Sequence, residues 1–168
     1  KYAKMRWRRN GLPTLEMPNG FGLRSFRVGQ DAERLTDIQN AAFADSWGFS
    51  PNTVEQIEVR VASKSTTPEG ILFVTAGDEI VAYNWTVRSA GAGGELGRIA
   101  MTGVHPDYRG RGLSRPAVLA GMQWMVSQGV QSIELEMDLA NVRAGKVYES
   151  LGFGTVANTV WYELGLDR

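Results

Sequence analysis

One short segment of the chain combines positive charge with backbone freedom in a way that suits anion binding. Residues 109–114 read Arg-Gly-Arg-Gly-Leu-Ser and precede a long helical pattern. The first turn of a helix leaves backbone N–H groups without partners, and the helix dipole adds positive potential there. Gly110 and Gly112 have no Cβ, so a phosphate can approach the backbone closely. Arg109, Arg111 and Arg115 add charge, and Ser114 adds a hydroxyl donor.

This segment alone does not identify its ligand. It lacks the Gly-Lys-Ser/Thr of a nucleoside triphosphate P-loop and the G-x-G-x-x-G of a dinucleotide fingerprint. Read without its neighbours, it fits an exposed turn with solvated arginines as well as it fits a phosphate site.

A second segment, residues 141–153, places an amide and a phenol on one helical face. Asn141 is a suitable helix N-cap. Tyr148 follows seven residues later, which is about two helical turns. Taken separately, the two residues are equally compatible with a plain cap and a packed aromatic side chain.

Together, the two segments resemble the GCN5-related N-acetyltransferase (GNAT) superfamily. The run from Arg109 reads Arg-x-x-Gly-x-Ser after Val-x-Pro and is similar to motif A, with Ser114 in place of Gly or Ala. The run from Asn141 reads Asn-x-x-Ala-x-x-x-Tyr-x-x-Leu-Gly-Phe and matches the second motif with its spacing intact. Both motifs occur in the family's order, which is more specific than either motif alone. Pro116 is less usual, and we expect it to delay the start of the helix by a residue or two.

The resemblance implies an acetyl-CoA-dependent N-acyltransferase in which an amine attacks the thioester directly. Tyr148 would protonate the departing thiolate, and backbone N–H groups near Thr102 would polarise the carbonyl. A longer acyl-CoA donor stays open. The implied coenzyme A-binding residues are Met101, Thr102, Gly103, Val104, Arg109, Gly110, Arg111, Gly112, Leu113, Ser114, Asn141 and Tyr148.

The general base is less sharply indicated. Glu95 is the only acid on the stretch that leads to Val104 and is our candidate, although it also fits a solvated strand end. His105 is the only histidine, but its place in Val-x-Pro is usually exposed in this family. Asp138 is a weaker candidate.

The resemblance implies an acceptor pocket for a small-molecule or peptide amine, lined by the first two helices, their loop and the last strands, although aromatic residues there also fit the core. We expect Trp47, Phe49 and Trp85 to line it, because aromatic faces bind cations, sugars and peptide ends. The wider set of candidates includes Tyr83, Trp161 and Tyr162.

Residues 11–21, 40–43 and 83–85 resemble a narrower group, the tandem acetyltransferases similar to mycothiol synthase. The resemblance implies a C-terminal half that partners a second GNAT domain or forms a homodimer. Arg98 stands where that group carries an acidic substrate-binding residue, which argues against mycothiol synthesis itself.

The hydrophobic periodicity and the Gly and Pro residues that break it predict a single α+β domain at residues 21–168, with residues 1–20 as a linker or N-terminal arm. Helices are expected at 31–44, 51–61, 113–128 and 141–150, with Ser50 as the N-cap of the second. Strands are expected at 21–28, 71–76, 80–88, 95–104, 132–138 and 153–164. The family resemblance implies a mixed, mostly antiparallel sheet in which two parallel strands splay apart near Val104 and Asp138.

The composition of the chain narrows the classes of function that it can have. Eighteen basic residues balance eighteen acidic ones, so an RNA-binding patch on the arginine turn is the weakest alternative. No apolar run approaches the roughly 20 residues of a membrane span. The absence of cysteine excludes thiolate nucleophiles and Cys-based metal sites; we expect no metal and a cytoplasmic protein. The main alternative to an enzyme is a catalytically weak GNAT domain that binds acyl-CoA or docks another domain.

Overall fold

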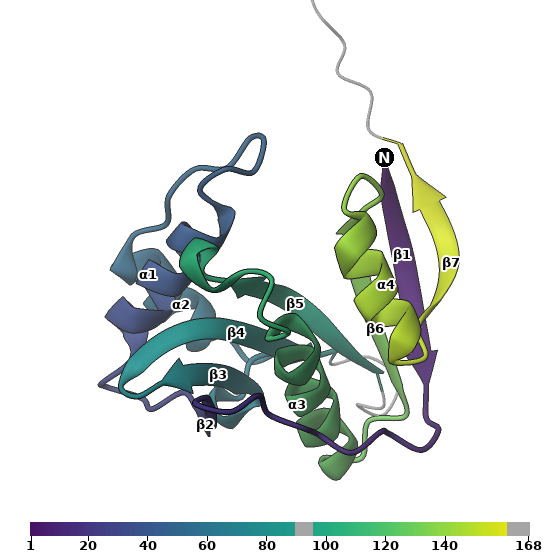
Figure 1. Ribbon diagram of the computed structural model, residues 1–168, viewed down its shortest axis with the longest axis horizontal. Coiled ribbons are helices and arrows are strands. Elements are labelled where there is room, and N and C mark those ends of the chain that lie inside the picture. The colour runs from purple at the N-terminus through teal and green to yellow at the C-terminus, as the bar shows by residue number, and fades with distance from the viewer. Residues whose placement is uncertain (90–95, 161–168) are drawn as a thin grey trace, which may run out of the picture.

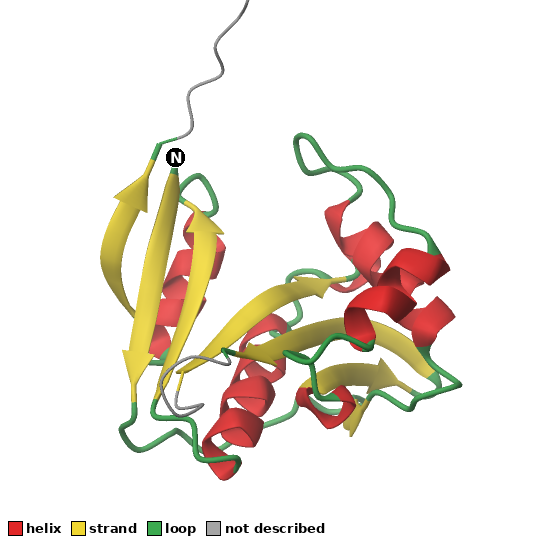
Figure 2. Ribbon diagram, turned by 180° about the vertical axis from the view of Figure 1, so that it is seen from behind, coloured by secondary structure: helices red, strands yellow, loops and turns green. Residues whose placement is uncertain are grey.

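The apolar and alternating runs of the sequence form one seven-stranded sheet in the computed structural model, which describes residues 1–89 and 96–160 (Figures 1 and 2). The strand order is β2-β3-β4-β5-β6-β1-β7, and among these described strands only β5 and β6 pair in parallel. This confirms the predicted α+β class. The strands are β1 (Tyr2–Arg8), β2 (Gly22–Ser25), β3 (Ile71–Ala76), β4 (Glu79–Arg88), β5 (Leu96–Val104), β6 (Ser132–Asp138) and β7 (Gly154–Thr159).

The first half of the sheet, β2 to β5, is covered on both faces (Figure 1). Helices α1 (Ala32–Phe43) and α2 (Val54–Val61) lie on one face, and α3 (Ser114–Ser127) lies on the other. Strand alternation directs Tyr83 and Trp85 toward the core under α1 and α2, while Ala82 packs with the start of α3. Burial on both faces explains why β3 and β4 read as continuous apolar runs.

A buried side chain fastens α3 to this half. Asn84 on β4 donates from Nδ2 to the carbonyl oxygens of Ala117 and Val118, at 3.1 and 3.2 Å. Gly121 permits this approach, because a Cβ there would stand 2.4 Å from Asn84 Nδ2. The first turns of α3 are therefore held against the sheet by a polar contact as well as by apolar packing.

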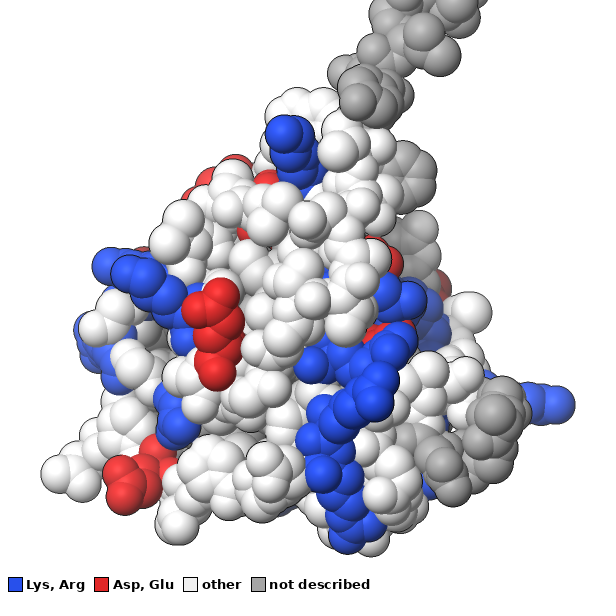
Figure 3. Space-filling view, turned by 90° about the vertical axis from the view of Figure 1, so that its right-hand side faces the viewer, with Lys and Arg blue, Asp and Glu red and all other residues white. Residues whose placement is uncertain are grey.

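The second half of the sheet, β6-β1-β7, is covered by α4 (Val142–Ser150) (Figure 2). Residues 2–8, which we expected to belong to a linker, form β1 between β6 and β7 instead. Ala3, Met5 and Trp7 are buried at every second position, and this period is the strand signal that the intervening charges obscured. Figure 3, which views this side of the molecule, shows a band of basic side chains with acidic atoms beside it.

The two halves separate between β5 and β6. Their parallel pairing is limited to Leu96–Ser132, Gly97–Ile133 and Arg98–Glu134. Beyond these pairs the strands diverge, as Figure 1 shows, and the predicted splayed pair is confirmed.

Helix boundaries depart from expectation at two places. The N-cap of α2 is Thr53 rather than Ser50, because Thr53 and Gln56 form a reciprocal capping box. Helix α3 begins at Ser114 without the delay expected from Pro116, since a third-position residue has no N–H partner to lose. Asn141 caps α4 as predicted, with its Oδ1 accepting the N–H of Ala144 at 3.1 Å.

The longest helix of the described residues, α3, has 14 residues. Within the described ranges, no helix combines the length and apolar character that crossing a membrane requires.

Candidate functional site

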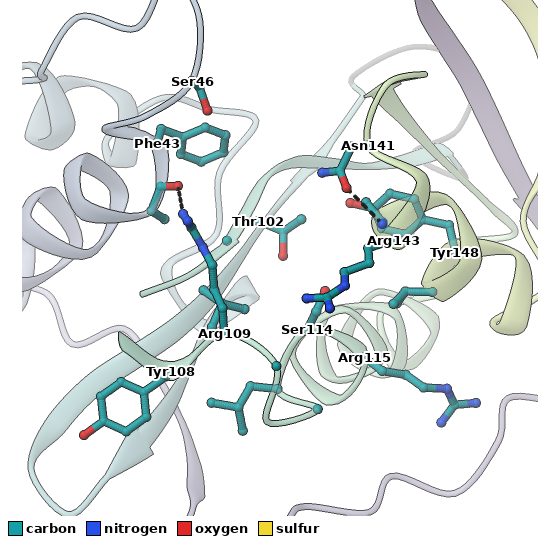
Figure 4. Close-up of a pocket in the computed structure, with 18 of the residues that line it drawn as sticks. Phe43, Ser46, Thr102, Tyr108, Arg109, Ser114, Arg115, Asn141, Arg143 and Tyr148 are labelled. Atoms are coloured by element: carbon teal, nitrogen blue, oxygen red, sulfur yellow. Dashed lines mark hydrogen bonds between the residues drawn. The ribbon is translucent and has the colours of Figure 1, made fainter. Parts of the chain in front are cut away.

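A cavity of about 710 Å³ opens where β5 and β6 diverge (Figure 4). This volume lies within the range of small-molecule sites. Four segments meet there: the end of α1 with its following loop, the end of β5, the turn before α3, and the first two turns of α4. The predicted coenzyme A-binding residues that line it are Thr102, Gly103, Val104, Arg109, Gly110, Gly112, Leu113, Ser114, Asn141 and Tyr148.

The turn before α3 has the backbone shape of an anion site. Gly110 and Gly112 adopt φ angles of 78° and 74°, which favour glycine. A Cβ on either would meet no heavy atom of the described residues within 4 Å, so the space beside the turn is open. Ser114 and Arg115 begin α3, and their N–H groups lie in the first turn, where the helix supplies no acceptor. The turn can therefore accept a phosphate on glycine backbone and helix N–H groups.

Arg109 links this turn to α1. Its Nη2 donates to the carbonyl oxygen of Ala42 at 2.9 Å, and its Nη1 lies 3.1 Å from Asp45 Oδ2. The hydrogen bond from Arg109 lowers the pKa of Asp45. Arg109 therefore joins two walls of the cavity in addition to lining it.

Two predicted coenzyme A-binding residues do not line the cavity. The guanidinium of Arg111 lies over the ring of Tyr108, 4.8 Å from its centroid. Met101 is half-buried and packs into the core beneath α1 and α2. Strand alternation turns its side chain away from the cavity.

Two further arginines line the cavity: Arg115, which the sequence already indicated as added charge beside the turn, and Arg143, which it did not indicate. Figure 4 shows Arg143 extending from α4 toward Ser114, and Arg115 lying on the side away from Arg109. Arg143 occupies the second position of α4, directly after the capping Asn141 and Val142. The sequence signal for Arg143 was its place just after the N-cap of a helix. That signal does not show what Arg143 faces, because the start of α4 meets the start of α3 only in the folded chain.

Tyr148 is a neutral donor at the cavity wall. Its side chain is 7% exposed and contacts the ring of Phe153 edge-on. Burial raises the pKa of Tyr148 to about 12. The phenol therefore keeps its proton at neutral pH and can donate it.

The structure does not bring His105 or Asp138, two of the three candidate bases, to this cavity. Glu95 lies outside the described residues. His105 and Asp138 do not line the cavity; His105 accepts the N–H of Asp107 through Nδ1, and Asp138 accepts the N–H of Ala140. Among the described residues that line it, Asp45 is the only carboxylate.

The three aromatic residues predicted to line the acceptor pocket lie in different surroundings. Trp85 is 1% exposed, donates from Nε1 to Thr66 Oγ1 at 3.1 Å and stacks beneath Arg60, so its prediction as a pocket residue is wrong. Its place on β4 directs it into the core, as it does Tyr83.

Trp47 is 88% exposed and does not line the cavity. Phe49 stacks on Phe43 with ring centroids 6.3 Å apart, and Phe43 does line it. Trp161 and Tyr162 lie outside the described residues.

Known proteins are similar to this chain in sequence and in fold. A family model described as the acetyltransferase (GNAT) family matches residues 32–153. A mycothiol acetyltransferase from Thermobispora bispora is 35% identical over 145 residues, which cover 84% of this chain and 49% of that protein. One from Kytococcus sedentarius is 33% identical over 154 residues, covering 90% and 51%. A GCN5-related N-acetyltransferase from Sphaerobacter thermophilus aligns with a TM-score of 0.80 at 24% identity, covering 92% of this chain and 48% of that one.

The chain thus spans about half the length of the curated relatives it matches. A second GNAT domain or a homodimer partner stays a prediction. The family model covers most of the chain, including both motif segments, and confirms the resemblance found in the sequence. The chain belongs to the acetyltransferase (GNAT) family.

Proposed function

We propose that this chain transfers an acetyl group from acetyl-CoA to an amine by direct attack within a ternary complex. The observation that carries the proposal is the meeting of two helix N-termini and a neutral, buried Tyr148 in one cavity. The first of these features suits phosphates, and the second suits a leaving group that needs a proton.

The chain's residues fit the parts of coenzyme A. The turn at residues 109–114 would hold the pyrophosphate on backbone N–H groups, with Arg143 as an added cation. Within the described part of the chain, β5 does not pair with β6 beyond Arg98. The backbone groups of Thr102 and Val104 on that side are therefore open to the amide groups of a pantetheine arm.

Bound acetyl-CoA would supply the acetyl group and a thiolate leaving group. Tyr148 would give the proton from its Oη to the departing sulfur. Glu95 stays our prediction for the group that takes the amine proton. Asp45 is a poor choice, since its bond to Arg109 lowers its pKa and so makes it a weaker base.

The acceptor would enter past the end of α1, where Phe43 and Ser46 line the cavity. Mycothiol acetyltransferases are among the relatives, and we propose a small amine as acceptor. Arg98, exposed on β5, argues for an acceptor different from theirs, because the sequence resemblance implies an acidic residue at this position in the similar tandem enzymes.

A panel of amines tests this proposal through thiol release from acetyl-CoA. We expect turnover with at least one small amine. Replacing Tyr148 with Phe should lower kcat by about 100-fold, the usual size of a general acid's contribution, with unchanged affinity for coenzyme A.

Tyr2→Phe provides the matched control, because Tyr2 is an exposed tyrosine on β1. Full activity of Tyr148→Phe would remove the acid role. Coenzyme A binding without turnover across the whole panel would instead favour a binding or docking module.

A further inference from the structure

A row of charged side chains crosses the sheet at the point where its two halves separate. Arg98 on β5, Glu134 on β6 and Arg6 on β1 are direct cross-strand partners. Arg6 donates from Nε to Glu134 Oε1 at 2.9 Å, and Lys4 Nζ lies 3.2 Å from Glu134 Oε2. Three cations therefore stand around one carboxylate, which is buried.

This row lies on the face of the sheet that carries α1 and α2. Arg98 is opposite Val87, which packs against the core beneath those helices, and cross-strand partners project to the same face. Ile133 and Leu135 pack into the core on the α3 side, so strand alternation turns Glu134 to the opposite face. In Figure 2, α4 lies behind β6, β1 and β7, and no described helix covers these strands on the side toward the viewer.

The guanidinium of Arg98 is available to a further anion. Its side chain is exposed, and none of residues 1–89 and 96–160 forms a hydrogen bond or an ion pair with it. Glu134 is already bound by Arg6 and Lys4. An arginine in this setting favours a carboxylate from outside the chain, which it can bind through two parallel hydrogen bonds.

Strand β5 connects Arg98 to the proposed reacting centre. The strand runs on from Arg98 to Thr102 and Gly103, which line the cavity between the two halves. Gly103 faces α1, since a Cβ there would stand 2.7 Å from the Cβ of Ala42. Four residues of strand span roughly 13 Å. An acceptor that enters past the end of α1 can therefore place its amine near Thr102 and extend along β5 toward Arg98.

We propose that the acceptor is an amine that also carries a carboxylate, and that Arg98 binds this carboxylate. The inference rests on the proposed function, because it assumes that the amine reacts near Thr102. It makes Arg98 a specificity-determining residue. It also predicts that several bonds separate the amine of the acceptor from its carboxylate.

Thiol release from acetyl-CoA with acceptors of equal length tests this inference. The acceptors are 6-aminohexanoate, 6-aminohexanamide and 1,6-diaminohexane, whose far ends are negative, neutral and positive. We expect kcat/KM to be about tenfold higher for the aminohexanoate than for the amide, as one charged hydrogen bond would give. The diamine should be the poorest acceptor, because like charges repel.

Substitutions of Arg98 should change this order mainly through KM. Arg98→Gln should remove the preference for the carboxylate, and Arg98→Glu should reverse it in favour of the diamine. Arg27→Gln is the matched control, because Arg27 is an exposed arginine in the turn after β2. It should leave the order of the three acceptors unchanged.

A binding measurement tests the anion site without turnover. Hexanoate and hexanamide both lack the amine, and ligand-detected NMR compares their affinities. We expect the wild-type chain to bind hexanoate more tightly than hexanamide, and Arg98→Gln to bind the two equally.

The outcomes distinguish the anion site from the proposed function. If the wild-type chain turns over amines but prefers the amide or the diamine, the inference is overturned while the proposed function stands. The same holds if Arg98→Gln keeps the preference for the carboxylate. If no amine is turned over but hexanoate binds through Arg98, the proposed function fails and the anion site stands. Equal binding of hexanoate and hexanamide to the wild-type chain overturns the anion site whatever the turnover.

Discussion

The two halves of the sheet are built differently, and the candidate site lies between them. Strands β3 and β4 are buried on both faces, under α1 and α2 on one side and α3 on the other. In the other half, every residue of β7 is exposed, and α4 covers the strands together with part of α3. The first half carries the phosphate turn, and the second carries Tyr148. The geometry of the site therefore depends on how a well-packed half is joined to a thinner one.

Each half contains one buried carboxylate held by two cations. Asp31, at the start of α1, binds Arg24 through two oxygens at 2.7 and 3.0 Å and also contacts Arg34. Glu134 on β6 binds Arg6 and Lys4 of β1. Since the two sites have similar chemistry, substitutions there compare the two halves directly.

The largest effect is expected at Asp31, whose side chain is fully buried. Asp31→Asn should lower the free energy of unfolding by about 3 kcal/mol, because it leaves the Arg24 guanidinium without its counter-charge. Urea denaturation at pH 7 measures this loss. Asp37→Asn, an exposed position on the same helix, is the control and should change stability little.

The same variant carries a pH signature. The hydrogen bonds from Arg24 lower the pKa of Asp31 below its ordinary value of 3.8. The folded state thus binds this proton less tightly than the unfolded state, so the stabilisation is present above pH 3.8 and is lost as the pH falls through the lowered pKa. The difference between wild type and Asp31→Asn should therefore shrink in acid. A constant difference down to pH 2 would contradict this account.

A smaller effect is expected at Glu134. Burial alone raises its pKa, but its bonds to Arg6 and Lys4 outweigh that effect and lower it. Because both partners are partly exposed, Glu134→Gln should cost about 1–2 kcal/mol. Glu136→Gln, exposed on the same strand, provides the control for unfolding measurements. A loss at Glu134 larger than the loss at Asp31 would reverse the proposed ranking of the halves.

The smallest effect is expected at the cap of α4. Asn141→Ala removes the bond to the Ala144 N–H and should cost about 1 kcal/mol of stability. Since Asn141 also lines the cavity, coenzyme A affinity should fall at the same time. Asn19→Ala, an exposed asparagine outside the helices, serves for comparison. An unchanged melting temperature would show that the cap contributes nothing to this half.

Much of the site could be predicted from local spacing. Gly110 and Gly112 indicated an open turn, and Asn141 indicated a cap, because these properties depend on neighbours within a few residues. Trp85 could not be placed in the same way. Whether Trp85 lies in a pocket or in the core depends on which face of β4 is covered by α2. That in turn depends on pairing between distant strands.

The sequence by itself determined the types of most elements, the chemistry of the phosphate turn and the two-turn spacing of Asn141 and Tyr148. Only the tertiary structure decided that residues 2–8 complete the sheet, and that Arg143 joins the cavity. The physical reason is the range of the interactions. Caps, turns and helical faces follow from contacts within about one or two turns of backbone. The strand β1 is fixed by β6, more than 120 residues away, and Arg143 meets the phosphate turn only where β5 and β6 part.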